Sequence, residues 1–185
     1  SQVTDEDGRI TIPNFYDDVE EVPAAEREMI AHIPFDEKKY MEAIGVKALK
    51  GEKGYSTLER NSCRPSFDVC GIWGGYTGEG SKTVLPSKAY AKVSCRLVPH
   101  QNHETISKLF VDYINNIAPD YVQVKVTPMH GGEGYVCPIT LPAYQAAEKG
   151  FEKAFGKKPL AVRRGGSIPI ISDFEQILGV KTVLM

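Results

Sequence analysis

The chain has 185 residues, of which 42% are hydrophobic and 25% are charged, and its net charge is −2. These values are typical of a soluble globular protein with one or two domains. They argue against nucleic acid as a partner, because phosphate backbones are bound by a surplus of clustered Lys and Arg. They also argue against a membrane protein, since no apolar run approaches the roughly 18 residues that span a bilayer.

The four cysteines, at positions 63, 70, 95 and 137, do not show a metal-binding spacing such as C-x-x-C. Scattered cysteines of this kind favour a reduced, cytoplasmic compartment. Cys95 falls among the apolar residues of an alternating segment, so we expect it to act as a small buried hydrophobe.

Hydrophobic period and helix-ending residues predict the elements of the first two thirds of the chain. Pro23 begins a helical pattern that runs to Ile33, and Asp36 caps a second helix that ends at Ile44. Residues 46–62 have no clean period and are expected to form a surface loop. Further along, the sequence predicts strands at 67–73 and 88–97 joined by a glycine-rich loop, a helix at 106–117 and a third strand at 122–127.

All three predicted strands have one polar side. In the first, Phe67, Val69 and Trp73 fall together on one side, and in the second Arg96 lies on the side that the apolar residues avoid. Strands of this type form antiparallel sheets that are covered on one face. We therefore expect an α+β fold, an antiparallel sheet with helices on one face.

The composition changes near residues 130–140, where glycines and a proline indicate a domain boundary. We place one domain at 1–135 and a second at 136–185. The second is predicted to contain a helix at 141–155, a strand at 160–162, a helix at 170–178 and an apolar strand at 180–185. That order is typical of a parallel α/β sheet, for which fifty residues are too few. We expect the chain to stop inside this domain.

Three local motifs allow competing interpretations. Residues 75–83 nearly match a phosphate-binding loop, but one extra residue precedes Lys82 and a strand follows where a helix is required. Ser167 either caps a tight turn or binds a carboxylate or oxyanion; a nucleophilic role is disfavoured because Pro169 stands where the elbow motif needs glycine. Arg96 is either a surface residue or a bidentate carboxylate binder.

Five motifs, taken together and in order, resemble one family. They are GIWGGY at 71–76, GSKTVLP at 80–86, RLVP at 96–99, HGG at 130–132 and R-x-GGSIP at 163–169. The chain resembles the zinc-dependent dipeptidases related to carnosinase, within the larger metallopeptidase family that includes aminoacylase and succinyl-diaminopimelate desuccinylase. The resemblance implies a ferredoxin-like dimerisation (lid) domain followed by part of a catalytic α/β domain.

The resemblance also implies roles for individual residues. Arg96 would bind the terminal carboxylate of a dipeptide or short peptide, and Gly166 and Ser167 would line the same side of the pocket. Thr83 would contact substrate bound in the partner subunit of a homodimer. Arg164 departs from the family pattern, which usually has glutamate there.

The same resemblance places the ligands of two Zn²⁺ ions and the general base outside this chain. It therefore predicts that the chain is inactive alone, although its parent is a hydrolase in which a zinc-activated water attacks the peptide bond. The alternative from another class is a non-enzymatic α+β module whose sheet binds a protein partner.

Overall fold

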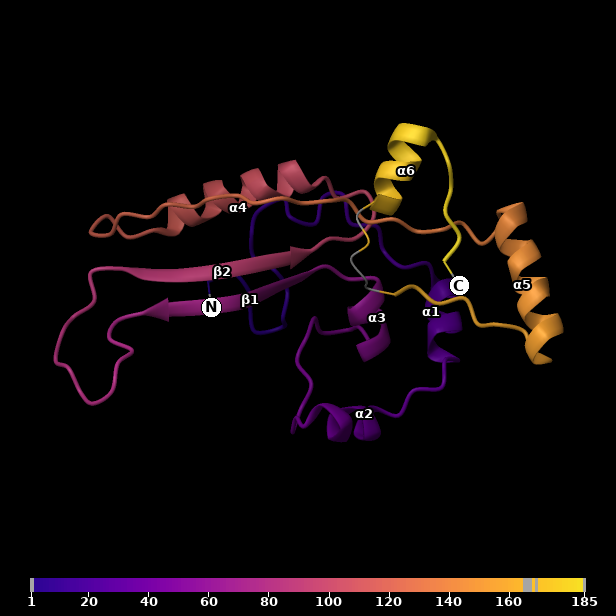
Figure 1. The fold of residues 1–185 in the computed structure, drawn as a ribbon, viewed down its shortest axis with the longest axis horizontal. Helices are drawn as coiled ribbons and strands as arrows, with labels where there is room; N and C mark the ends of the chain where they lie inside the picture. The colour runs from indigo at the N-terminus through magenta and orange to yellow at the C-terminus, as the bar shows by residue number, and fades with distance from the viewer. Residues whose placement is uncertain (1, 165–167, 169, 185) are drawn as a thin grey trace.

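The computed structural model describes residues 2–164, 168 and 170–184, and its two strands and six helices follow one another along the chain as shown in Figure 1. The elements are helices α1 (Ala24–Ala31), α2 (Glu37–Ile44) and α3 (Thr57–Ser62), strands β1 (Ser66–Gly74) and β2 (Ala89–Arg96), and helices α4 (His103–Ile117), α5 (Pro142–Phe155) and α6 (Ile170–Leu178). The predicted α+β class is confirmed.

Strands β1 and β2 form an antiparallel hairpin with an irregularity between Val69 and Gly71. Before it Phe67 pairs with Cys95, and after it Ile72 pairs with Ala91. The extra residue returns Ile72 to the face of Phe67 and Val69 and moves Trp73 to the opposite face. The prediction that Trp73 shares a face with Phe67 is wrong, because simple alternation does not include a bulge.

Helix α4 covers one face of the hairpin, as predicted. Phe67 of β1 and Phe110 of α4 place their ring centroids 5.9 Å apart. Beneath them lies a core whose buried members are Ile10, Ile12, Phe15 and Ile106. Because the turn-rich segment before α1 contributes three of these four residues, it is an integral part of the domain.

The predicted helix ends agree closely with those in the structure. The side chain of Asp36 accepts a hydrogen bond from the backbone N–H of Lys39, 3.1 Å away, and Gly45 ends α2 with φ of 71°. Helix α3, by contrast, occupies part of the predicted loop 46–62. Its start was identifiable from the Ser56-x-x-Glu59 pattern, which forms a complete capping box.

Three predicted strands are wrong. Residues 122–127, 160–162 and 180–184 are assigned to no strand, and the last residue of the chain lies outside the described residues. In each segment the side-chain pattern indicated an extended backbone, but a strand also needs a neighbour that accepts and donates ladder hydrogen bonds. Only β1 and β2 pair as strands in the described part of the chain.

Candidate substrate-binding site

Arg96 is the last residue of β2 and lies on the open face of the hairpin, opposite the face that α4 covers. Its neighbours on that face are Ser66, directly across the ladder, and Asp68 and Ser94. The side chain is exposed, and no described carboxylate lies within ion-pair distance of it. Asp68 instead accepts a hydrogen bond from the Ser66 hydroxyl at 2.7 Å. The guanidinium of Arg96 is therefore available to an external anion.

Thr83 lies in the long loop that joins the two strands. The N–H of Val84 donates to the carbonyl of Lys82 at 2.9 Å, so the backbone turns tightly at Thr83 and this residue is exposed. The loop is ordered around Tyr76, whose hydroxyl donates to the carbonyl of Glu79 at 3.0 Å. The ammonium of Lys82 lies 5.4 Å from the centre of the Tyr76 ring.

An open hollow of about 320 Å³ lies beside this turn. Its walls come from both arms of the loop, including Tyr76, Lys82, Val84 and Lys88. Thr83 itself does not line the hollow, so its side chain is presented to the exterior and not to a pocket within this chain.

Thr83 and Arg96 lie at opposite ends of the hairpin. The loop begins beyond the Gly74–Ala89 pair, and Arg96 belongs to the pair at the other end. The seven residue steps of β2 between these pairs correspond to roughly 23 Å at about 3.3 Å per residue. A dipeptide extends over only about 7 Å. Within a single chain, the two residues cannot hold one dipeptide together.

The remaining predicted site residues, Gly166 and Ser167, lie outside the described residues. The neighbouring Arg163 is described and reaches back to α1. Its terminal nitrogen donates to Glu26 at 2.7 Å, and its Nε lies 2.5 Å from the other carboxylate oxygen without the alignment of a hydrogen bond. Arg164, where the family pattern usually has glutamate, is exposed.

Within the described part of the chain, no group of three His, Cys, Asp or Glu side chains could hold a metal ion. The described side chains therefore do not fit a zinc centre. None of the described helices is long and apolar enough to cross a membrane.

The sequence did not identify a set of contacts around Glu133 and Tyr135. Glu133 accepts hydrogen bonds from Asn102 at 2.9 Å and from Gln176. The Tyr135 hydroxyl donates to the carbonyl of Thr182 at 2.9 Å and accepts from its N–H at 3.0 Å. Burial is the main reason that the pKa of Tyr135 lies above its ordinary value, so the hydroxyl retains its proton.

Burial also shifts a pKa on the covered face of the hairpin. It raises the pKa of Cys95 to about 11, with a smaller contribution from the carboxylate of Asp68. The thiol is half-buried and packs against the main core, as expected for a small hydrophobe.

The described elements define an α+β domain, and comparison with known proteins identifies its family. The family model described as the peptidase dimerisation domain (M20_dimer) matches residues 12–122. The chain belongs to this family.

Two curated relatives and one solved structure illustrate the similarity. The Cys-Gly metallodipeptidase dug1 of Schizosaccharomyces pombe is 30% identical over 181 residues, which cover 96% of this chain and 38% of the relative. Human Beta-Ala-His dipeptidase is 28% identical over 188 residues, covering 99% and 37%. The M20 family metallo-carboxypeptidase Sso-CP2 of Sulfolobus solfataricus superposes with a TM-score of 0.85 at 28% identity, covering 98% and 41%.

The chain therefore spans about two fifths of the length of these M20 metallopeptidases. The resemblance to carnosinase-like dipeptidases, which rested on five sequence motifs, is confirmed.

Proposed function

We propose that this chain supplies the dimerisation domain and part of the substrate site of a zinc-dependent dipeptidase, acting in the cytoplasm on dipeptides or short peptides. Residues 1–135 form the dimerisation (lid) domain, and residues 136–185 form part of the catalytic α/β domain. The ligands of the two zinc ions and the general base belong to other parts of the parent enzyme, so the chain alone is inactive.

In this proposal the role of the chain is to bind and orient substrate. The planar guanidinium of Arg96 holds the terminal carboxylate through paired charge-assisted hydrogen bonds. Gly166 and Ser167 line the same side of the pocket. A carboxylate fixed in this way holds the peptide in one orientation, which is the positioning contribution to catalysis.

The observation that carries the proposal is the separation of Thr83 from Arg96 along one hairpin. Both residues can hold one dipeptide only if they come from two copies of the chain. A twofold-symmetric homodimer provides two such sites, each with Arg96 from one subunit and Thr83 from the other. The match to a peptidase dimerisation domain supports the same arrangement.

The surface available for dimerisation lies on the α4 side of the hairpin, at the part of the strands that the helix does not cover. Val69 is 59% exposed and Ile72 is 79% exposed, on the same face as the core-packed Phe67. Leu85, in the connecting loop, is 96% exposed. Apolar side chains gathered on one protruding hairpin are typical of an interface.

The test is complementation between two binding-defective variants. We expect the wild-type chain to bind Cys-Gly, and not its C-terminal amide, in an NMR titration, and we expect Arg96→Ala and Thr83→Ala each to weaken binding at least tenfold. A refolded equimolar mixture of the two variants regains about a quarter of the wild-type sites, because half of its dimers are mixed and each has one intact site.

Lys92→Ala is the matched control, since it removes a cation from the same open face as Arg96. It should bind like the wild type. Unchanged binding in Arg96→Ala, or no recovery in the mixture, would contradict the proposed role of Arg96 or the shared site, respectively.

A further inference from the structure

The backbone at residues 131–134 is pressed against the loop that follows Arg96. A Cβ atom at Gly134 would lie 2.8 Å from the backbone nitrogen of Pro99, and one at Gly131 would lie 2.8 Å from the His103 ring. Such distances leave no room for a side chain at Gly134, where the neighbour is backbone. The two segments are therefore in direct contact close to the end of β2.

The loop after Arg96 is itself firmly anchored. Gln101 is only 1% exposed; its side chain accepts from the N–H of Val98 at 3.0 Å and donates to the carbonyl of Phe15 at 2.8 Å. Because Phe15 belongs to the main core, these two bonds fix the loop to the centre of the first domain.

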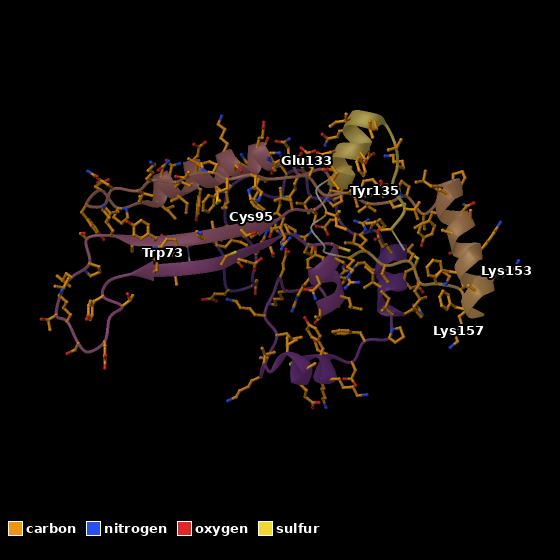
Figure 2. The ribbon with its side chains drawn as sticks, in the orientation of Figure 1. Trp73, Cys95, Glu133, Tyr135, Lys153 and Lys157 are labelled. Carbon is orange, nitrogen blue, oxygen red and sulfur yellow. The ribbon has the colours of Figure 1, made fainter. Side chains whose placement is uncertain are left out.

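Glu133 extends this anchorage to the second domain. One of its carboxylate oxygens accepts from Asn102, whose own side-chain oxygen caps α4 by accepting from the N–H of Thr105 at 2.9 Å. The other oxygen accepts from Gln176 of α6. Figure 2 shows Glu133 and Tyr135 beside α6, in the segment that has run back past α4. Tyr135 adds a second link through its two hydrogen bonds to Thr182.

We propose that Glu133 is a positioning residue that fixes the Arg96 end of β2 relative to α6, with Tyr135 as its auxiliary. The inference rests on the proposed function, in which Arg96 belongs to the dimerisation domain and α6 to the catalytic one. A carboxylate suits this place because its two oxygens accept from donors in different domains. Its removal breaks both bonds at once and loosens Arg96 from the second domain.

The first test is hydrogen exchange on the 185-residue chain. In Glu133→Ala and in Gln176→Ala, the amides of α6 should exchange about tenfold faster than in the wild type, while those of β2 are unchanged. Gln176 is exposed, so its variant reports on the link even if Glu133→Ala folds poorly. Glu148→Ala is the control, because it removes an ion pair to Lys158 that does not cross between the domains. Unchanged exchange of α6 in Gln176→Ala would overturn the inference.

The second test separates positioning from binding. Glu133→Ala should weaken Cys-Gly binding about three- to tenfold while the preference over the C-terminal amide persists, and Glu133→Gln should recover part of the loss. If Arg96→Ala abolishes binding but Glu133→Ala leaves it unchanged, Glu133 does not position the site. If Arg96→Ala has no effect, the proposed function is wrong, and the exchange measurement still decides whether Glu133 links the domains.

Discussion

The buried apolar residues are concentrated in residues 1–135, whereas Ile171 is the only one in the described part of residues 136–185. Phe15 and Ile12 are 1% and 3% exposed, whereas Ile177 and Leu178 of α6 are 78% and 63% exposed, and Phe155 of α5 is 73% exposed. Figure 1 shows α5 standing apart from the other helices at one end of the molecule. Residues of this type are normally covered.

The difference indicates that residues 1–135 contain a core of their own, while α5 and α6 present apolar faces that need a partner surface. This supports the proposal that residues 136–185 are part of a larger catalytic domain. The same difference predicts that single substitutions cost much more stability in the core of residues 1–135 than on the exposed faces of α5 and α6.

The largest effect is expected at the centre of the first core. Phe15→Ala should lower the free energy of unfolding by about 3–5 kcal/mol, because the deletion removes buried contacts and leaves a cavity. Phe155→Ala removes the same side chain from an exposed helix and should change it by no more than about 0.5 kcal/mol. Urea unfolding of both variants checks the comparison, and equal losses would contradict it.

A smaller effect is expected at a buried ion pair between Glu52 and Arg64. Two nitrogens of Arg64 donate to the two oxygens of Glu52, each at 2.8 Å, and the arginine side chain is only 2% exposed. Glu52→Gln retains the shape but loses one charged acceptor, and should cost about 1.5–3 kcal/mol. Glu148→Gln, at the partly exposed pair with Lys158, should be nearly neutral in the same urea measurement.

The pH dependence of stability sharpens the comparison further. Burial alone would raise the pKa of Glu59, but hydrogen bonds from Arg27 and Ser56 outweigh it and hold this pKa below the ordinary value. A lowered pKa stabilises the fold above the pKa of the unfolded carboxyl and loses that contribution as the pH falls. The stability gap between wild type and Glu59→Gln should therefore shrink between about pH 6 and about pH 3. A stability difference that does not vary with pH would show that the charged Glu59 carboxylate does not stabilise the fold.

The smallest change is one of reactivity alone, and it compares a covered cysteine of the hairpin with an exposed one. Cys95 has a pKa of about 11, whereas Cys70 is exposed, so iodoacetamide should label Cys95 roughly 100-fold more slowly at about pH 8. Peptide mapping by mass spectrometry measures both rates. In urea the two cysteines should react alike, and similar rates in the folded protein would show that α4 does not protect this face.

The parts of the fold that sequence predicts well are those set by local signals. Asp36 and Gly45 end α2 because capping depends on neighbouring residues, and α4 was predicted from its apolar stripe. The three wrong strands needed partners that local sequence does not specify. The change of face at Trp73 depends on a bulge, which simple alternation does not show.

The candidate site, too, was only partly predictable from local sequence. The motifs identified Thr83 and Arg96, but their separation along one hairpin depends on strand register, which no motif contains. The substrate-binding roles of Thr83, Arg96, Gly166 and Ser167 all stay predictions. The links from Glu133 to Gln176 and from Tyr135 to Thr182 join residues 43 and 47 positions apart, and no local pattern indicates them.

The central claim is that two copies of this chain share each substrate site, and sedimentation velocity tests it most directly. The wild-type chain should sediment as a dimer whose population rises with concentration, and Ile72→Asp should be a folded monomer because it places a charge in the exposed apolar face of the hairpin. Lys92→Asp, on the opposite face, should still dimerise. A wild-type chain that stays monomeric at every concentration would contradict the account.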